Sequence, residues 1–390
     1  MARDEGPGKR PGVLVVVGTR PEAIKMAPVL AALRRERDTL DTALALTGQH
    51  SEMVDQVLDA FGIEPDFDLE IMRPGQDLYD LAHACLDGLR RIVNEFRPEM
   101  ILVQGDTATV FYTSLVGFLE GVRVGHVEAG LRSGDKWAPF PEEIFRRLAD
   151  VLADHYFAPT PWARDNLLGE GVPDERIHLT GNPVVDALLS TIQRKAAPSN
   201  EVLDRLLRAG SPLVLLTAHR RESFGAPLRE VFSAVRELAD RVPELEVLYP
   251  VHPNPEVLEP AYELLGGHPR VHLTEPLGYL DLVKALSAAT LVLTDSGGIQ
   301  EEAPTFGTPV LILREVTERP EGVEAGVARL VGTRREEILE GALAILSAGG
   351  PQAARPPNPY GDGRAGERIA DIVRASLTGM PRKTGDWDPS

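Results

Sequence analysis

TDSGGIQEEAP, residues 294–304, lies between the apolar runs Leu291–Leu293 and Val310–Leu313. An apolar strand, then a polar turn with two glycines, then a helical pattern is typical of an α/β protein that presents backbone N–H groups at a helix N-terminus. Open α/β sheets bind their ligands at the carboxyl ends of such strands. The stretch therefore predicts an α/β fold with an anion site at this point.

The residue types in this turn suit a nucleotide diphosphate. Gly297 and Gly298 carry no Cβ, so a phosphate could approach the backbone closely, and Ser296 could cap the helix or donate to the same phosphate. Because phosphate repels carboxylates, at least one of Glu301 and Glu302 should face another group, such as the ribose hydroxyls. A plain tight turn has the same Ser-Gly-Gly pattern, so the motif alone leaves both interpretations open.

Length and composition limit the classes of protein. A chain of 390 residues suits two domains. Its 41 Lys and Arg against 59 Asp and Glu give a net charge of −18, which disfavours nucleic acid or an anionic membrane as partner. The one cysteine, Cys85, lies in a helical pattern and predicts a core thiol. The first apolar run, Val13–Val17, is too short for a signal peptide or a membrane span, so we expect a cytoplasmic protein.

The first βα turn supplies two basic candidates. The buried-strand pattern Val13–Val17 ends in residues 18–22, where Pro21 suits the first turn of a helix. Arg20 lies in this turn and is expected at the ligand edge of the sheet. Lys25 lies one turn further along and could equally be a solvated helix charge.

Two acidic residues follow later strands of the first half. Asp106 comes just after Met100–Val103, and Glu128 comes just after Val122–Val127. Because the carboxyl ends of parallel strands lie at one edge of a sheet, both side chains should point into one crevice. Asp106 is also compatible with capping the next helix.

Glu142 and Arg146 lie four residues apart in the helical pattern that follows the loop 134–141. This spacing puts them on one helix face, where a surface ion pair contributes about 0.2–0.5 kcal/mol. Alternatively, Glu142 reaches into the crevice and Arg146 keeps it ionised.

The second half restarts the pattern at Leu213–Thr217. His219 follows this strand and precedes two arginines, a grouping that can bind a pyrophosphate. Arg319 also follows a strand end, whereas His252, flanked by prolines, is expected to be structural.

The alternation of strands and helices predicts two Rossmann-like domains facing a central cleft, as in the B-type glycosyltransferase architecture. We expect an N-terminal domain, 1–185, joined by the last helix, 364–378, and a C-terminal nucleotide-binding domain, 186–363. The polar tail, 379–390, is expected to be mobile. No Gly-x-Gly-x-x-Gly follows the first strand and no metal-ligand spacing occurs, so we expect neither a nicotinamide cofactor nor a metal.

The chain resembles the non-hydrolysing UDP-N-acetylglucosamine 2-epimerases along nearly its whole length. The segments that carry the resemblance are GTRPEAIKMAPV (18–29), TGQH (47–50), GDT (105–107), GHVEAGLRSGD (125–135), PFPEE (139–143), TGNPVVDAL (180–188), HRRE (219–222), VHPNP (251–255), LTDSGGIQEEAP (293–304), TERPEG (317–322) and NPYGDG (358–363). The resemblance implies a cytoplasmic, homodimeric isomerase that interconverts UDP-GlcNAc and UDP-ManNAc without NAD or metal.

The resemblance also implies roles for the matching residues. The catalytic set is Asp106, Glu128 and Glu142 as acid/base candidates, Lys25 and Arg146 as their supports, and His219 at the diphosphate. The binding set is Arg20, Ser296, Gly297, Gly298 and Arg319 at the nucleotide, and Glu302 at its ribose.

Three positions depart from the family pattern. Phe145 and Ser223 stand where the family usually has Asn, and Leu282 stands where an aromatic residue commonly packs near the uracil. These departures leave open a 2-epimerase acting on a different nucleotide sugar. A hydrolysing variant that releases ManNAc and UDP, a B-type glycosyltransferase and a non-catalytic sensor are further alternatives, the sensor being disfavoured because all three candidate carboxylates are present.

Bacterial members of this family can also be activated by a second molecule of UDP-GlcNAc. Gln49, His50 and His252 are possible remnants of that regulatory site, but Glu52 and Gly75 replace a Gln and an Arg. We therefore expect substrate activation to be weak or absent.

Overall fold

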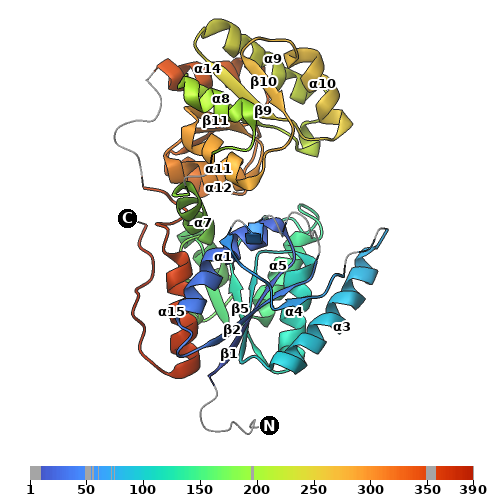
Figure 1. Cartoon of the computed structure of the whole chain (residues 1–390), viewed down its shortest axis with the longest axis vertical. Coiled ribbons are helices and arrows are strands. Elements are labelled where there is room, and N and C mark those ends of the chain that lie inside the picture. The colour runs from blue at the N-terminus through green and yellow to red at the C-terminus, as the bar shows by residue number, and fades with distance from the viewer. Residues whose placement is uncertain are drawn as a thin grey trace. The chain divides into compact units, whose positions relative to one another are not determined.

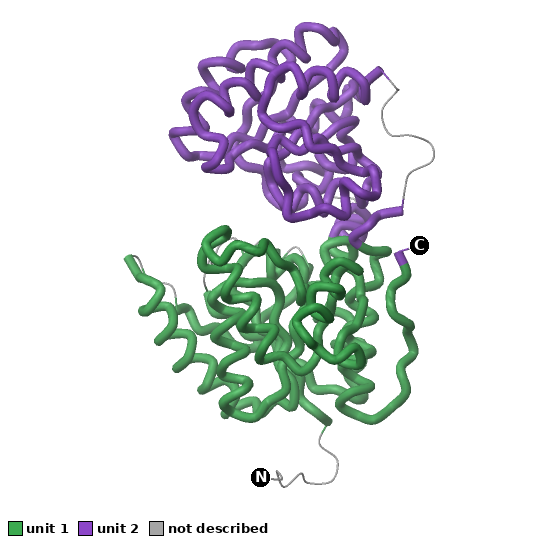
Figure 2. Tube along the Cα trace, turned by 180° about the vertical axis from the view of Figure 1, so that it is seen from behind, with its two compact units in different colours: residues 1–187, 361–388 green, residues 188–360, 389–390 purple. Residues whose placement is uncertain are grey.

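The computed structural model describes residues 10–48, 54, 57–59, 61–71, 73, 75–194, 197–347 and 357–389. The chain folds into two compact units, which Figure 2 shows in different colours. Unit 1 comprises 1–187 and 361–388, and unit 2 comprises 188–360 and 389–390. Each unit has its own parallel sheet (Figure 1) and its own apolar core.

Unit 1 is built on a parallel sheet with the strand order β3-β2-β1-β4-β5-β6-β7. Its strands are β1 (Gly12–Val17), β2 (Asp41–Leu46), β3 (Phe67–Asp68), β4 (Met100–Gln104), β5 (Arg123–Val127), β6 (His155–Ala158) and β7 (Ile177–Leu179). The central strand β1 is buried along its whole length, which explains its continuous apolar run. In register, Val13 lies beside Thr42 of β2 and Met100 of β4.

The helices of unit 1 connect these strands and cover both faces of the sheet (Figure 1). They are α1 (Arg20–Arg35), α3 (Leu78–Phe96), α4 (Ala108–Leu119), α5 (Glu142–Leu152), α6 (Pro161–Gly169), η1 (Asp174–Arg176), α7 (Pro183–Ile192), which runs on into unit 2, and α15 (Ala365–Thr378). The last helix, α15, packs on α1, so the end of the chain returns to the first unit (Figure 1). Cys85 is buried in the core and burial raises its pKa to about 12, which confirms the expected core thiol.

Unit 2 repeats the design with the strand order β10-β9-β8-β11-β12-β13. Its strands are β8 (Leu213–Thr217), β9 (Glu246–Pro250), β10 (Val271–Thr274), β11 (Leu291–Thr294), β12 (Val310–Ile312) and β13 (Ala328–Leu330). Its helices are α8 (Glu201–Ala209), η2 (Arg221–Ser223), α9 (Ala226–Arg241), α10 (Pro255–Leu265), α11 (Tyr279–Ala288), α12 (Gly297–Glu302), η3 (Ala303–Phe306), α13 (Pro320–Glu324) and α14 (Arg335–Ser347). The expected α/β class with doubly wound parallel sheets is therefore confirmed.

The segment after α15 is packed, and the expectation of a mobile tail is wrong for its described residues. Trp387 is buried, and its backbone N–H donates to the Leu179 carbonyl at 2.7 Å. The backbone N–H groups of Lys383 and Thr384 donate to Asp371 Oδ2 at 2.6 and 2.8 Å. One buried aromatic ring and one buried carboxylate thus anchor a segment whose composition is otherwise polar.

Within the described residues, no helix is both long and apolar enough to cross a membrane.

Candidate active site

The turn after β1 is tied to the start of α4 through one buried carboxylate. Glu22 Oε2 accepts the backbone N–H groups of Gly18 at 2.5 Å and Thr19 at 3.1 Å, and Oε1 accepts the Thr107 hydroxyl at 2.6 Å. Gly18 has no room for a side chain, because an added Cβ would lie 2.2 Å from Thr109 Oγ1. Burial raises the pKa of Glu22 to about 7, although these hydrogen bonds favour the ionised form. Two loops at the carboxyl edge of the sheet are thereby joined.

Glu128 follows β5 and is held by donors from three elements. Lys25 Nζ of α1 lies 2.5 Å from Oε1, Asn182 Nδ2 donates to the same oxygen at 2.9 Å, and Gln104 Nε2 donates to Oε2. The backbone of Glu128 has φ +67°, a conformation that non-glycine residues seldom adopt and that recurs at functional sites. Lys25 is largely buried in this contact, so it is no solvated helix charge.

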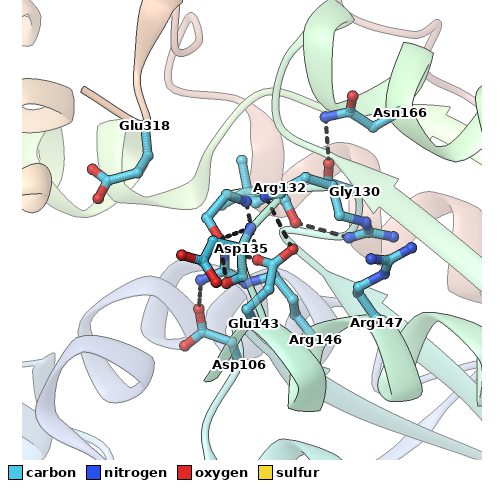
Figure 3. A network of polar contacts seen from close by, with 12 residues as sticks. Asp106, Gly130, Arg132, Asp135, Glu143, Arg146, Arg147, Asn166 and Glu318 are labelled. Carbon is cyan, nitrogen blue, oxygen red and sulfur yellow. Dashed lines mark hydrogen bonds and ion pairs between the residues drawn. The ribbon is translucent and has the colours of Figure 1, made fainter. Parts of the chain in front are cut away.

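Asp106 follows β4 and contacts Arg146 of α5, as Figure 3 shows. The same guanidinium donates from Nη1 to Glu143 Oε2 at 3.1 Å. Glu143 is buried and also accepts the backbone N–H groups of Ser133 at 3.0 Å and Gly134 at 3.4 Å. The helix α4 is capped by Thr107, so Asp106 is left to contact Arg146.

The expected pairing of Arg146 with Glu142 is wrong. Arg146 uses the carboxylate three residues earlier, Glu143, because that side chain points into the interior. Glu142 is half-buried at the first position of α5, and its side chain makes no hydrogen bond or ion pair with any residue that the structure describes. The i,i+3 spacing to Arg146 was as readable in the sequence as the i,i+4 spacing, but spacing does not tell which of two adjacent carboxylates is buried.

In unit 2, His219 follows β8 and contacts Asp295, the residue after β11. Asp295 is buried, and its Oδ2 accepts the backbone N–H groups of His219 and Arg220 at 2.7 and 2.8 Å. Its Oδ1 lies 3.6 Å from His219 Nδ1. The His252 ring stacks on His219 with 5.5 Å between centroids, so the proline-flanked histidine is part of the same cluster. Burial lowers the pKa of His219 more than Asp295 raises it, which favours a neutral imidazole.

The Ser-Gly-Gly turn after β11 forms the start of α12. Ser296 is the N-cap residue, but its hydroxyl makes no capping hydrogen bond. A Cβ added at Gly297 or Gly298 would have no neighbour closer than 3.8 Å, so it would make only ordinary van der Waals contacts there. Glu301 is buried and contacts Arg319 Nε.

Sequence reasoning missed four residues that contact these candidates or their supports: Gln104, Glu143, Asn182 and Asp295. Gln104 ends β4 directly before the GDT motif, and the other three lie within quoted motifs near a strand end or a helix start, so position was the available signal. Within the described residues, no group of three or more His, Cys, Asp and Glu side chains could hold a metal ion.

The family model described as UDP-N-acetylglucosamine 2-epimerase matches residues 31–374. The chain belongs to this family. A probable UDP-N-acetylglucosamine 2-epimerase from Ralstonia solanacearum is 47% identical over 372 residues, which cover 93% of this chain and 98% of that protein. The sequence resemblance is therefore confirmed.

Solved structures of the epimerase family share the fold. A putative UDP-N-acetylglucosamine 2-epimerase from Listeria monocytogenes aligns with a TM-score of 0.90 and 42% identity over 97% of this chain and all of that chain. The enzyme from Neisseria meningitidis, crystallised with UDP-GlcNAc, aligns with a TM-score of 0.84 and 41% identity over 93% of this chain and 99% of that one. A kitacinnamycin glycosyltransferase, 15% identical with a TM-score of 0.61 over 95% of this chain and all of that chain, shares the fold alone.

The three departures from the epimerase pattern are accommodated by packing. The Phe145 ring stacks on Phe111 of α4 at 5.3 Å and meets Tyr112 edge-on at 6.1 Å. Ser223 is buried in η2, and Leu282 of α11 packs against the core of unit 2. The expected regulatory residues Gln49, His50 and Glu52 lie outside the described residues.

Proposed function

We propose that the chain is a non-hydrolysing 2-epimerase that interconverts UDP-GlcNAc and UDP-ManNAc. The observation that carries the proposal is the pair of anchored carboxylates at one sheet edge, Asp106 with Arg146 and Glu128 with Lys25. Family membership supports the same conclusion. We further propose that the enzyme is a cytoplasmic homodimer.

The reaction needs an order of bond changes that side chains can support. The C2–H of the sugar is barely acidic beside a neutral amide. If the C1–O bond breaks first, UDP leaves with the bonding electrons and C1 becomes cationic, so the C2 proton becomes acidic. A carboxylate removes that proton and a 2-acetamidoglucal forms. C2 is then protonated from the opposite face and the UDP oxygen bonds to C1 again. The configuration at C2 is thereby inverted.

Each role has candidates among the residues described above. Asp106, Glu128 and Glu142 are the acid/base candidates, with Arg146 and Lys25 positioning the first two. Stabilising the leaving diphosphate requires donors and positive charge. We assign this role to Arg20, His219, Arg319 and the Ser296–Gly298 turn, with Glu302 at the ribose.

Proton NMR of the purified protein with UDP-GlcNAc in D2O, without added NAD or metal, tests the proposal. We expect UDP-ManNAc to appear with deuterium at C2, because the removed proton exchanges with solvent. Release of free ManNAc in step with UDP would instead indicate the hydrolysing variant. Folded protein that binds UDP but leaves UDP-GlcNAc unchanged would contradict the proposed substrate and favour another nucleotide sugar.

A further inference from the structure

A buried histidine contacts the loop that carries Asp106. His126 lies in β5 and is completely buried. Its Nε2 lies 2.7 Å from the Gly105 carbonyl oxygen, and its Nδ1 lies 2.7 Å from Asp150 Oδ1 of α5. The ring therefore bridges α5 and the turn after β4.

Both ring nitrogens of His126 must donate. A backbone carbonyl can only accept, and the Asp150 carboxylate is ionised because its other oxygen accepts from Arg132 Nη2 at 2.7 Å and from the Gly130 N–H at 3.3 Å. Burial alone would lower the pKa of His126, but the contacts with Asp150 and the Gly105 carbonyl together outweigh burial and raise it. The charged groups that face this cluster are Asp150 from α5 and Arg132 from the loop after β5, which is itself paired with Glu170 at the end of α6. A neutral imidazole carries a proton on only one nitrogen, so neither neutral tautomer could donate both hydrogen bonds. The ring is therefore an imidazolium.

The hydrogen bond to Gly105 sets the direction of the next N–H. The peptide between Gly105 and Asp106 is trans, so its carbonyl and its N–H point in opposite directions. With the carbonyl directed at His126, the Asp106 N–H is directed away from the buried ring. Gly105 has φ +86°, which glycine adopts without strain. The Asp106 N–H has no hydrogen-bond partner among the described residues.

We propose that His126 is a positioning residue for the reaction proposed above. Held between Asp150 and the Gly105 carbonyl, it fixes the 105–106 peptide so that the Asp106 N–H donates to an oxygen of the bound nucleotide sugar. Arg146 meanwhile holds the carboxylate of the same residue. One residue then presents a donor and a base to the substrate, and both are oriented from the interior of unit 1.

Two amide variants separate this role from core packing. The amide nitrogen of Gln can replace Nε2 and keep the bond to Gly105, whereas that of Asn can replace Nδ1 and keep the bond to Asp150. We expect His126→Asn to lower kcat by roughly 10- to 100-fold, because the peptide is released, with KM and UDP affinity nearly unchanged. His126→Gln should rescue most of the activity. His155→Asn, which removes a partly buried imidazole from the neighbouring strand β6, is the matched control and should keep the wild-type kcat.

The outcomes distinguish the two roles. Each His126 variant loses one buried hydrogen bond. If the role of His126 is purely structural, both variants should lose thermal stability and should have the same kcat. That result would overturn the proposal.

A ¹⁵N NMR measurement of the ring in the wild-type protein is independent of substrate and of the variants' folding. A protonated Nε2 at neutral pH supports the proposal, and a ring that carries no proton on Nε2 overturns it. Wild-type protein inactive on UDP-GlcNAc would instead contradict the proposed function, and the NMR result would still decide the state of His126.

Discussion

Asp106 takes its position from residues far away in the sequence. Its carboxylate contacts Arg146, forty residues later, and its backbone follows the Gly105 carbonyl that His126 holds. The side chain is only 30% exposed, so its charge is partly withdrawn from water and directed by one guanidinium. This fixed, partly buried carboxylate suits the general-base role proposed above.

Replacing Asp106 by Asn tests this role at the level of one residue. We expect kcat to fall by roughly 100- to 10,000-fold, because the amide cannot accept the C2 proton, while UDP affinity is retained. Steady-state kinetics and calorimetric titration with UDP measure the two quantities. Asp38→Asn, in the exposed turn after α1, is the control. A near-wild-type rate in Asp106→Asn would remove this residue from the mechanism.

His219 is the residue whose removal should act on binding. We expect His219→Ala to weaken UDP binding about tenfold, because one hydrogen-bond donor to the diphosphate is lost. The matched control is His83→Ala, an exposed histidine of α3 whose ring hydrogen-bonds only to the Tyr79 carbonyl among the described residues. Calorimetric titration with UDP measures both variants. An unchanged Kd for His219→Ala would refute its role at the nucleotide.

At the scale of elements, each sheet places its polar groups at the carboxyl ends of its strands. In unit 1 these groups follow β1, β4 and β5, and in unit 2 they follow β8 and β11. Buried carboxylates join neighbouring turns: Glu22 joins the turns after β1 and β4, and Asp295 joins those after β8 and β11. Within each unit, the two turns are therefore linked to each other by a buried carboxylate.

The Glu22 contact predicts a pH-dependent stability. Its folded-state pKa of about 7 lies above the unfolded value of about 4.5, so the folded state binds the extra proton. The stability advantage is complete below the unfolded value and is lost as pH rises through about 7. Relative to Glu22→Gln, the wild-type free energy of unfolding should therefore fall by on the order of 1–3 kcal/mol between pH 5 and pH 8.

Urea unfolding of both proteins across this pH range measures the difference, and the other titrating groups cancel because both proteins contain them. If the wild type instead gains stability relative to Glu22→Gln as pH rises, the donors from Gly18, Thr19 and Thr107 dominate over burial and the predicted sign is wrong.

At the scale of the whole molecule, one chain carries two sheets with separate cores, and the last helix returns to the first unit. Catalytic candidates lie mainly in unit 1 and nucleotide-binding candidates mainly in unit 2.

Glu52 and Gly75 replace two residues that the family resemblance links to regulation by substrate. We therefore expect activation by UDP-GlcNAc to be weak or absent.

The corresponding kinetic prediction concerns the reverse reaction. The initial rate should depend hyperbolically on the concentration of UDP-ManNAc. Adding UDP-GlcNAc should not change the shape of this curve. Coupled assays over a wide range of UDP-ManNAc concentration measure this dependence. A sigmoidal curve that becomes hyperbolic on addition of UDP-GlcNAc would contradict the prediction.

Local patterns in the sequence determined the elements and the general location of the site. Continuous apolar runs such as Val13–Val17 become buried parallel strands because both faces of the sheet are covered. Pro21 and Thr160 mark helix starts through their own backbone and capping chemistry. Asp106 and Glu128 follow strand ends, and that position alone predicted that they lie at the carboxyl edge of the sheet.

Only the tertiary structure decided which side chains meet. Helical spacing allows Arg146 to pair with Glu142 or Glu143, and the packing of α5 selects the buried one. The bridge from His126 to Asp150 and the burial of Trp387 join segments that no local pattern relates. Periodicity reports how a segment folds on itself, whereas long-range partners depend on how helices pack on sheets, and that packing is a property of the whole fold.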